Sequence, residues 1–337
     1  MRNDDRRHVA IKRKAVMTKS GRQIRRAIRH PDKAVRYGMR KVRQALFWNR
    51  YYDAVRDPKA KTRVDMDPTI QVDVVQDLKA ARFEVVDYNI DMSDLRSYLA
   101  RACYDRYPDY CGTDIGRLPE KTLEHYLAAQ LLELSPQDVY VDIAASDSPT
   151  PEIYHDLYGC TVYRQDLTYP SGVHGNMIGG DAASMPVADG FATKMAMHCS
   201  FEHFEGDSDM RVIREAGRVL RPGGRLCIVP FYLRNHYVVQ TDPCVYPAGN
   251  VQFEDDALIC CTKGWGHRHG RHYDVPHLRA RIVPNLNGLQ LTIHVVANEK
   301  AVGQSCYVKF IGLFRKTVPR QADWPLPNSF LAERKAD

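Results

Sequence analysis

The chain has 337 residues, of which 44% are hydrophobic and 26% are charged, as in globular proteins with one large domain or two. No apolar run approaches the roughly 20 residues that span a bilayer, and the polar, basic start of the chain lacks the apolar centre of a secretory signal. The nine cysteines show no CxxC spacing, and their odd number favours reduced thiols, so we expect a cytoplasmic protein.

The net charge of +7 is distributed unevenly along the chain. Residues 1–63 hold 21 of the 48 Lys and Arg residues and 5 of the 41 Asp and Glu residues, which gives a net charge of +16. The rest of the chain, with 27 basic and 36 acidic residues, carries −9. We therefore predict a basic N-terminal arm, residues 1–63, ahead of an acidic core.

A helix is predicted within this arm, because Pro31 suits a helix start and apolar residues follow at helical spacing. Four of them share one face: Val35, Met39, Val42 and Leu46. Five basic residues are interspersed: Lys33, Arg36, Arg40, Lys41 and Arg43. Such a helix can dock on its own domain, lie on an anionic membrane surface or bind nucleic acid. We expect nucleic acid less than the other two, and a membrane contact would place the protein at the inner membrane surface.

Residues 64–116 are predicted to be a lead-in or cap segment with an edge strand in FEVVDYNI, residues 83–90. Asp and Tyr residues cluster between 105 and 110, where polar aromatic side chains could meet a substrate, although a surface loop is the simpler interpretation. A helix is predicted from Glu120 to Leu134, because leucines recur along one of its faces, and Ser135-Pro136 ends it.

From residue 139 onward, strands alternate with turns and helices. Strands are predicted at 139–143, up to Asp166, at 193–198 and at 225–231, with helices ending near Gly159 and covering 207–220. Asp181 follows Asp166 by only 15 positions, so a turn should replace the helix between them. This repeat implies a parallel sheet with a ligand at its carboxyl edge. An irregular insertion at 232–272, a helix near 275–283 and strands at 289–296 and 305–314 should follow.

Five motifs occur in order along this region: VDIAASDSP, RQD, GDAASMPV, FEH and VLRPGGRL. They resemble the class I S-adenosylmethionine-dependent methyltransferases, and most of all a branch acting on small molecules and sugars, whose motifs read LDIGCGTG, VD, GDAxxLPF, LEH and VLKPGGRL. The resemblance covers residues 117–316 and leaves 317–337 as a tail. It implies an α/β fold with a Rossmann-like, seven-stranded, mostly parallel sheet and helices on both faces.

The first motif departs from the family's pattern, because Ala144, Ser146 and Ser148 stand where glycine is usual. Glycine serves there because the backbone approaches the ligand and can adopt positive φ. We expect a loop of ordinary φ and ψ that still admits a nucleoside, since Ala and Ser add only a small Cβ. The alternative is a degenerate pocket that no longer binds a cofactor.

The resemblance implies S-adenosylmethionine as the cofactor. Asp166 lies 24 residues after Asp142, the distance at which a second-strand acid meets a ribose. Asp181 and Ala182 would hold the adenine. The remaining predicted cofactor contacts lie in the first loop and after the fourth strand: Asp142, Ala144, Ala145, Ser146 and His198.

Methyl transfer is an in-line displacement that depends on positioning, and a hydroxyl acceptor also benefits from a base. The predicted bases are three histidines: His203, His267 and His272. The segment WGHRHGRHYD is a loose match to the family's GHxRxY-like substrate segment and adds four predicted substrate contacts: Arg268, His269, Arg271 and Tyr273. A polar loop without a role in catalysis is the alternative. No metal is expected, because the spacing of Cys260 and Cys261 to these histidines fits no closed zinc site.

The sequence thus predicts methylation of an oxygen atom on a saccharide, a glycolipid or another small metabolite. Methylation of a nucleic-acid base is disfavoured, because HCSF at 198–201 occupies the place of an Asn/Asp-Pro-Pro-Tyr motif. Two alternatives stay open: an RNA methyltransferase whose arm binds phosphates, and a non-catalytic relative that uses the fold as an interaction module.

Overall fold

The computed structural model describes residues 70–107, 110, 118–242, 244–245, 251, 253–262, 264–303 and 306–318. Within the predicted arm it describes six helical positions: 31, 35, 38, 39, 42 and 46. The rest of the arm, the start of the lead-in segment, the predicted boundary at residue 117 and the tail from residue 319 lie outside the described residues.

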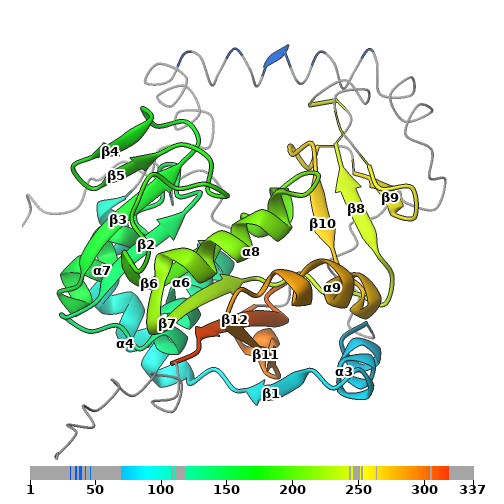
Figure 1. Ribbon diagram of the computed structural model, residues 1–337, viewed down its shortest axis with the longest axis horizontal. Helices are drawn as coiled ribbons and strands as arrows, with labels where there is room; N and C mark the ends of the chain where they lie inside the picture. The colour runs from blue at the N-terminus through cyan, green and yellow to red at the C-terminus, as the bar shows by residue number, and fades with distance from the viewer. Residues whose placement is uncertain are drawn as a thin grey trace, which may run out of the picture.

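A nine-stranded sheet forms the centre of the molecule, in the order β1-β11-β12-β7-β6-β2-β3-β5-β4 (Figure 1). Its strands are β1 (Glu84–Tyr88), β2 (Val139–Ile143), β3 (Thr161–Asp166), β4 (Gly172–His174), β5 (Met177–Gly179), β6 (Ala192–His198), β7 (Leu220–Val229), β11 (Leu289–Val296) and β12 (Phe310–Lys316). Strand β12 is antiparallel to both neighbours and β4 is antiparallel to β5, whereas the other adjacent pairs are parallel. The mostly parallel sheet is confirmed, with nine strands where the resemblance implied seven.

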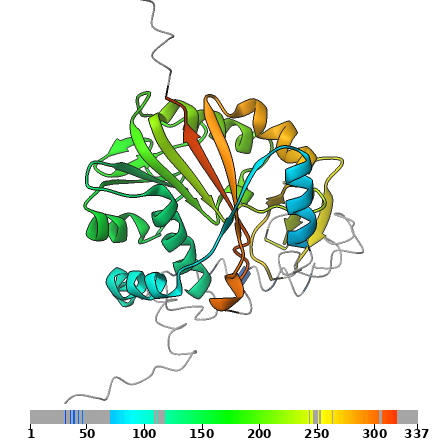
Figure 2. The ribbon, with the colours of Figure 1, turned by 90° about the horizontal axis from the view of Figure 1, so that it is seen from below.

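Helices cover both faces of this sheet (Figure 2). The α-helices in the described core are α3 (Ile70–Ala80), α4 (Met92–Ala102), α6 (Leu118–Leu132), α7 (Thr150–Tyr158), α8 (Ser208–Val219) and α9 (Val275–Arg281). Short 3-10 helices lie at η1 (Tyr104–Arg106), η2 (Phe201–His203), η4 (Val283–Asn285) and η5 (Glu299–Ala301). Buried residues of α3, α8 and α9 pack in one apolar cluster, and those of α4, α6 and α7 pack in another.

Strand β2 shows why two apolar layers form. Its side chains alternate between the faces, so that Val141 and Ile143 join the cluster under α8 while Tyr140 joins the cluster under α6. All three side chains are at most 1% exposed. Burial of a large apolar side chain contributes roughly 1.5–3 kcal/mol, so this strand stabilises both layers at once.

The predicted lead-in segment belongs to the same sheet. Strand β1 pairs in parallel with β11, from Glu84 opposite Thr292 to Tyr88 opposite Val296. The edge strand predicted in FEVVDYNI is therefore confirmed. Because β1 and its flanking helices contribute to the two apolar clusters, the fold begins well before residue 117.

The predicted irregular insertion is wrong in part, because it contains a second sheet. Strands β8 (Val238–Thr241), β9 (Leu258–Cys261) and β10 (Gly270–His272) pair in the order β10-β8-β9. Their short length and the His, Cys and Gly residues in them conceal the alternating pattern by which strands are predicted.

The helix between β3 and β5 is absent, as predicted, and the residues form the β4–β5 hairpin instead. Residues 221–224, between the predicted helix at 207–220 and the predicted strand at 225–231, belong to β7, whose pairing register with β6 shifts between Ala192 and Lys194. Among the residues that the structure describes, no helix is long and apolar enough to cross a membrane.

Candidate active site

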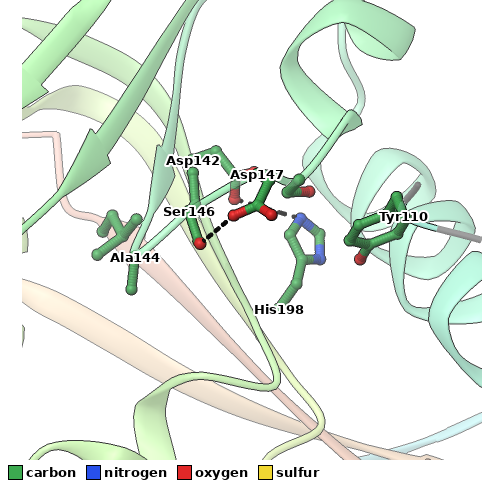
Figure 3. A pocket seen from close by; sticks show the side chains of 9 residues that line it. Tyr110, Asp142, Ala144, Ser146, Asp147 and His198 are labelled. Carbon is green, nitrogen blue, oxygen red and sulfur yellow. Dashed lines mark hydrogen bonds and ion pairs between the residues drawn. The ribbon is translucent and has the colours of Figure 1, made fainter. Parts of the chain in front are cut away.

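A cavity of about 260 Å³ opens at the carboxyl edge of the central sheet, beside the ends of β2 and β6 (Figure 3). Nine residues line it: Tyr110, Asp142, Ile143, Ala144, Ala145, Ser146, Asp147, Ser148 and His198. Pockets for whole drug-sized ligands start at roughly 300 Å³, so this cavity has room for part of a nucleoside-sized molecule. Five of the eight predicted cofactor contacts lie around it: Asp142, Ala144, Ala145, Ser146 and His198.

Two lining side chains carry polar atoms without a partner among the described residues. They are Oδ2 of Asp142 and Nδ1 of His198, and both side chains are more than nine-tenths buried. Their other atoms face each other, with His198 Nε2 3.7 Å from Asp142 Oδ1 and 3.2 Å from the Tyr140 hydroxyl. Because an unsatisfied buried polar atom costs about 1–3 kcal/mol, two of them at one cavity indicate a ligand that completes their hydrogen bonding.

Burial governs the ionisation of this pair. It raises the pKa of the Asp142 carboxyl to about 8 and lowers the pKa of the His198 imidazole to about 3. Near neutral pH the imidazole is therefore uncharged, and the carboxyl retains its proton unless a cation approaches. An ammonium group in the cavity would favour the ionised carboxylate.

The loop after β2 does not have the ordinary backbone angles that we expected. Ala144 has φ 54° and Ser146 has φ 46°, so both adopt the left-handed conformation that glycine takes without strain. The loop thus keeps a glycine-like path although it lacks glycine. Non-glycine residues in this region cost roughly 1–2 kcal/mol each, which the surrounding hydrogen bonds must offset.

Asp166 organises the same loop from the neighbouring strand. Its Oδ2 accepts from the Ser146 amide at 2.9 Å, and its Oδ1 accepts from the amide and hydroxyl of Thr168 at 2.8 and 2.7 Å. Tyr169 donates from its hydroxyl to the Ser146 carbonyl. Asp166 is therefore joined to the cavity loop but does not line the cavity. Its contact with a ribose stays a prediction.

Asp181 and Ala182 lie further from the cavity, after β5. The Asp181 carboxylate accepts from the Ala183 amide at 2.9 Å and lies 3.4 Å from Arg211, while 44% of its side chain is exposed. Ala182 is 6% exposed and packs in the apolar cluster under α8. Their contact with an adenine also stays a prediction.

The predicted histidine bases do not line the cavity. The His203 and His267 rings stack with centroids 4.5 Å apart, and His203 Nδ1 lies 2.6 Å from the His269 carbonyl oxygen. His272 is 3% exposed and stacks on Tyr232, and burial lowers its pKa to about 3. His269 is 1% exposed, and burial lowers its pKa to about 3 as well. Imidazoles with such low pKa values are weak proton acceptors.

Three predicted substrate contacts form ion pairs or hydrogen bonds with residues of the chain itself. Arg271 is 1% exposed and lies 3.0 Å from Asp209, which also accepts from the Tyr273 hydroxyl. Arg268 forms an ion pair at 2.6 Å with Glu205. This geometry favours a structural role for Arg271 and Tyr273, because they anchor β10 to the start of α8.

A buried polar group on α6, outside every predicted motif, adjoins His125, whose ring contacts the cavity-lining Tyr110. Glu124 on α6 is fully buried; its carboxylate accepts from Lys121 Nζ at 3.1 Å and from the Tyr307 hydroxyl at 2.8 Å. Burial raises the pKa of Glu124 to about 7, and Lys121 opposes that shift. Burial is the main cause of the raised pKa of Tyr110, which lines the cavity, and the charge of Glu124 adds to that rise.

Tyr110 also joins the cavity to a series of polar contacts that runs through His125 of α6 to Tyr104. Its hydroxyl lies 3.4 Å from His125 Nε2, and His125 Nδ1 lies 2.8 Å from the Tyr104 hydroxyl. The signal that could have found these groups is the pair Glu124-His125, two polar residues inside a helix predicted to cover the sheet. Tyr110 belongs to the Asp and Tyr cluster that was predicted to be able to meet a substrate.

No group of three or more His, Cys, Asp and Glu side chains suited to a metal ion occurs within the part of the chain that the structure describes.

The family comparison decides the identity of this fold. Residues 155–228, from within α7 to the end of β7, match the family model described as a methyltransferase domain. This match covers four of the five predicted motifs: RQD, GDAASMPV, FEH and VLRPGGRL. Its strands belong to a sheet in which β12 is the antiparallel inner strand. The chain therefore contains a class I S-adenosylmethionine-dependent methyltransferase domain. No curated protein matches the chain in sequence.

Solved structures of methyltransferases are similar to this methyltransferase domain at low sequence identity. One is 1,6-didemethyltoxoflavin-N1-methyltransferase from Burkholderia thailandensis with S-adenosylhomocysteine bound, at 14% identity and a TM-score of 0.42, covering 69% of this chain and 94% of that one. Another is an S-adenosylmethionine-dependent methyltransferase from Methanosarcina mazei, at 15% identity and a TM-score of 0.36, covering 55% of this chain and 95% of that one. Neither likeness extends to a substrate for this chain.

Proposed function

We propose that this methyltransferase transfers a methyl group to a hydroxyl oxygen of a saccharide, a glycolipid or another small metabolite. The observation that carries the proposal is the cavity lined by Asp142 and His198, together with buried Glu124, whose neighbour in the chain, His125, contacts the cavity-lining Tyr110. A hydroxyl acceptor loses a proton when its oxygen is methylated, and a carboxylate with a pKa near 7 is suited to receive that proton.

The residues at the cavity fit the amino-acid end of S-adenosylmethionine. Asp142 Oδ2 is buried without a partner among the described residues, which suits an ammonium group. The left-handed Ala144 and Ser146 let the backbone pass close to a ligand, as glycine does in related loops. When bound, the cofactor supplies an electrophilic methyl group on a sulfonium.

The chain's own residues then have separate roles in the proposal. Asp142 and the loop after β2 hold the cofactor's amino acid. His198, uncharged and at the end of β6, orients groups at the cavity by hydrogen bonding. Glu124 accepts the acceptor's proton, and Lys121 and Tyr307 hold its carboxylate in place by the hydrogen bonds described above. Positioning of this kind is the main contribution that a protein makes to methyl transfer.

Binding and turnover separate this proposal from its alternatives. Calorimetry with S-adenosylhomocysteine should show one site, and absence of binding at millimolar ligand would favour a non-catalytic interaction module. Radiolabelled S-adenosylmethionine should then label a hydroxyl compound within a panel of saccharides and glycolipids. Label transferred to RNA in place of these compounds would support the RNA alternative.

The Glu124→Gln variant sharpens this experiment. It should lower turnover at least about 100-fold, the contribution of a general base, while S-adenosylhomocysteine affinity stays within about twofold. A matched control is Glu133→Gln, because Glu133 lies just beyond the same helix and its side chain is 69% exposed. Equal turnover of both variants would exclude Glu124 as the base.

A further inference from the structure

The described positions of the N-terminal segment present an unpartnered apolar face. Val35, Met39, Val42 and Leu46 are helical and are 61%, 53%, 55% and 68% exposed. A Cβ atom built at Gly38 on the same helix would meet no atom within 4 Å. Figure 1 shows these described residues, in blue, at the periphery of the molecule and away from the central sheet.

The sequence surrounds this face with positive charge. The apolar residues recur at steps of 4, 3 and 4, so they form one stripe along a helix. In the same helical periodicity, the basic residues fall to the side of this stripe or opposite to it: Lys33, Arg36, Arg40, Lys41 and Arg43. Residues 31–46 include a single acidic residue, Asp32.

We propose that this segment lies in the surface of an anionic lipid bilayer, with the apolar stripe among the acyl chains and the basic residues at the headgroups. A bilayer surface receives both parts of the pattern at once. A nucleic acid would neutralise the charges but leave the stripe in water. Docking on the chain's own sheet would bury the stripe, whereas its four side chains are more than half exposed.

This inference is independent of the methyl acceptor and goes beyond the proposed function. It gives the protein a peripheral attachment at one end of the chain, while the cavity lies at the carboxyl edge of the sheet. Each Lys or Arg that lies at the surface of an anionic membrane raises the affinity of the protein for that membrane about fivefold.

Vesicle flotation with the full chain tests the proposal. The protein should bind vesicles of phosphatidylcholine with about one third phosphatidylglycerol and release them as salt rises, and it should bind pure phosphatidylcholine vesicles much more weakly. The variant with Val42→Ser and Leu46→Ser should bind the anionic vesicles at least about tenfold more weakly, because it loses two apolar anchors. The variant with Arg40→Gln and Lys41→Gln should bind roughly 25-fold more weakly at low salt.

The matched control replaces two apolar residues of similar exposure outside this segment. Val72 is 60% exposed and Val318 is 67% exposed, and changing both to Ser should leave vesicle binding unchanged. S-adenosylhomocysteine binding and the unfolding temperature report that every variant is folded. The proposal would be overturned if the variant with Val42→Ser and Leu46→Ser bound anionic vesicles as tightly as the unchanged protein. It would also be overturned if the unchanged protein did not bind anionic vesicles. RNA binding that depends on the charges but not on the stripe would overturn it too.

Discussion

Two buried polar groups of this protein differ in one decisive respect. At the cavity, Asp142 and His198 each keep a polar atom without a partner among the described residues. At the second sheet, Arg271 is equally buried, but it donates to the Tyr237 hydroxyl at 2.9 Å and to the Phe204 carbonyl at 2.7 Å, and it lies 3.0 Å from Asp209. The comparison teaches that burial alone does not identify a functional polar residue. Beside a cavity, the free atoms of Asp142 and His198 point to a ligand, whereas the complete set of partners around Arg271 points to a structural role.

The largest effect is expected when the hydrogen bonds and ion pairs of Arg271 are removed. Arg271→Met should lower the free energy of unfolding by about 3–5 kcal/mol, because buried Asp209 keeps only Arg281 as a counter-charge and the hydrogen bonds of Arg271 are lost. Denaturant unfolding measures the loss. The control is Arg268→Met, whose ion pair with Glu205 is 30% exposed on each side and should contribute at most about 1 kcal/mol. Similar losses in both variants would contradict a special role for the buried cluster.

At the cavity, the opposite pattern is expected. Asp142→Asn should weaken S-adenosylhomocysteine binding by about 1.5–3 kcal/mol, the contribution of a hydrogen bond to a charged group. It should not lower the free energy of unfolding, since the free carboxyl oxygen has no partner to lose among the described residues. Calorimetry and denaturant unfolding measure the two effects separately. Asp189→Asn is the control, because its side chain is 82% exposed.

The raised pKa of Asp142 also predicts a pH dependence. An ammonium ligand needs the ionised carboxylate, so S-adenosylhomocysteine affinity should rise by up to about tenfold per pH unit below 8 and then level off. In the empty cavity, the same raised pKa makes ionisation of the Asp142 carboxyl unfavourable. The free energy of unfolding of the ligand-free protein should therefore fall as pH rises from about 4 to 8. Calorimetry between pH 6 and 9 measures the affinity. The slope should be absent in Asp142→Asn, and an equal slope there would assign it to another group.

The smallest expected effect concerns the loop after β2. Ala144→Gly should relieve the backbone strain at positive φ, which stabilises the fold, but glycine loses more chain entropy on folding. The first effect should at least balance the second, so the free energy of unfolding should stay level or rise by up to about 1 kcal/mol. Ala145→Gly, at a residue outside the positive-φ set, should lower stability by roughly 0.5–1 kcal/mol. Thermal unfolding of both variants measures the difference. If both variants were destabilised equally, the loop would not be strained at Ala144.

The sequence by itself determined the central sheet with good accuracy. Strands β2 and β11 have the predicted bounds, and β3 ends at Asp166 as predicted. These elements are set by local signals, since apolar runs are bounded by turn residues within a few positions. The same order of motifs brought Asp142, the loop after β2 and His198 to one cavity, because the carboxyl ends of parallel strands share an edge.

Tertiary structure alone decided which polar residues complete the site. Tyr307 reaches Glu124 across 183 positions of sequence, and Tyr110 reaches the cavity from a segment without a motif. Likewise, only the fold shows that Arg271 pairs with Asp209 and that Ala144 adopts a glycine-like φ. Such contacts depend on how distant elements pack and on how many hydrogen bonds each buried group completes. The local periodicity of the sequence shows neither the packing of distant elements nor the number of completed hydrogen bonds, because it reflects only the spacing of residues along one strand or helix.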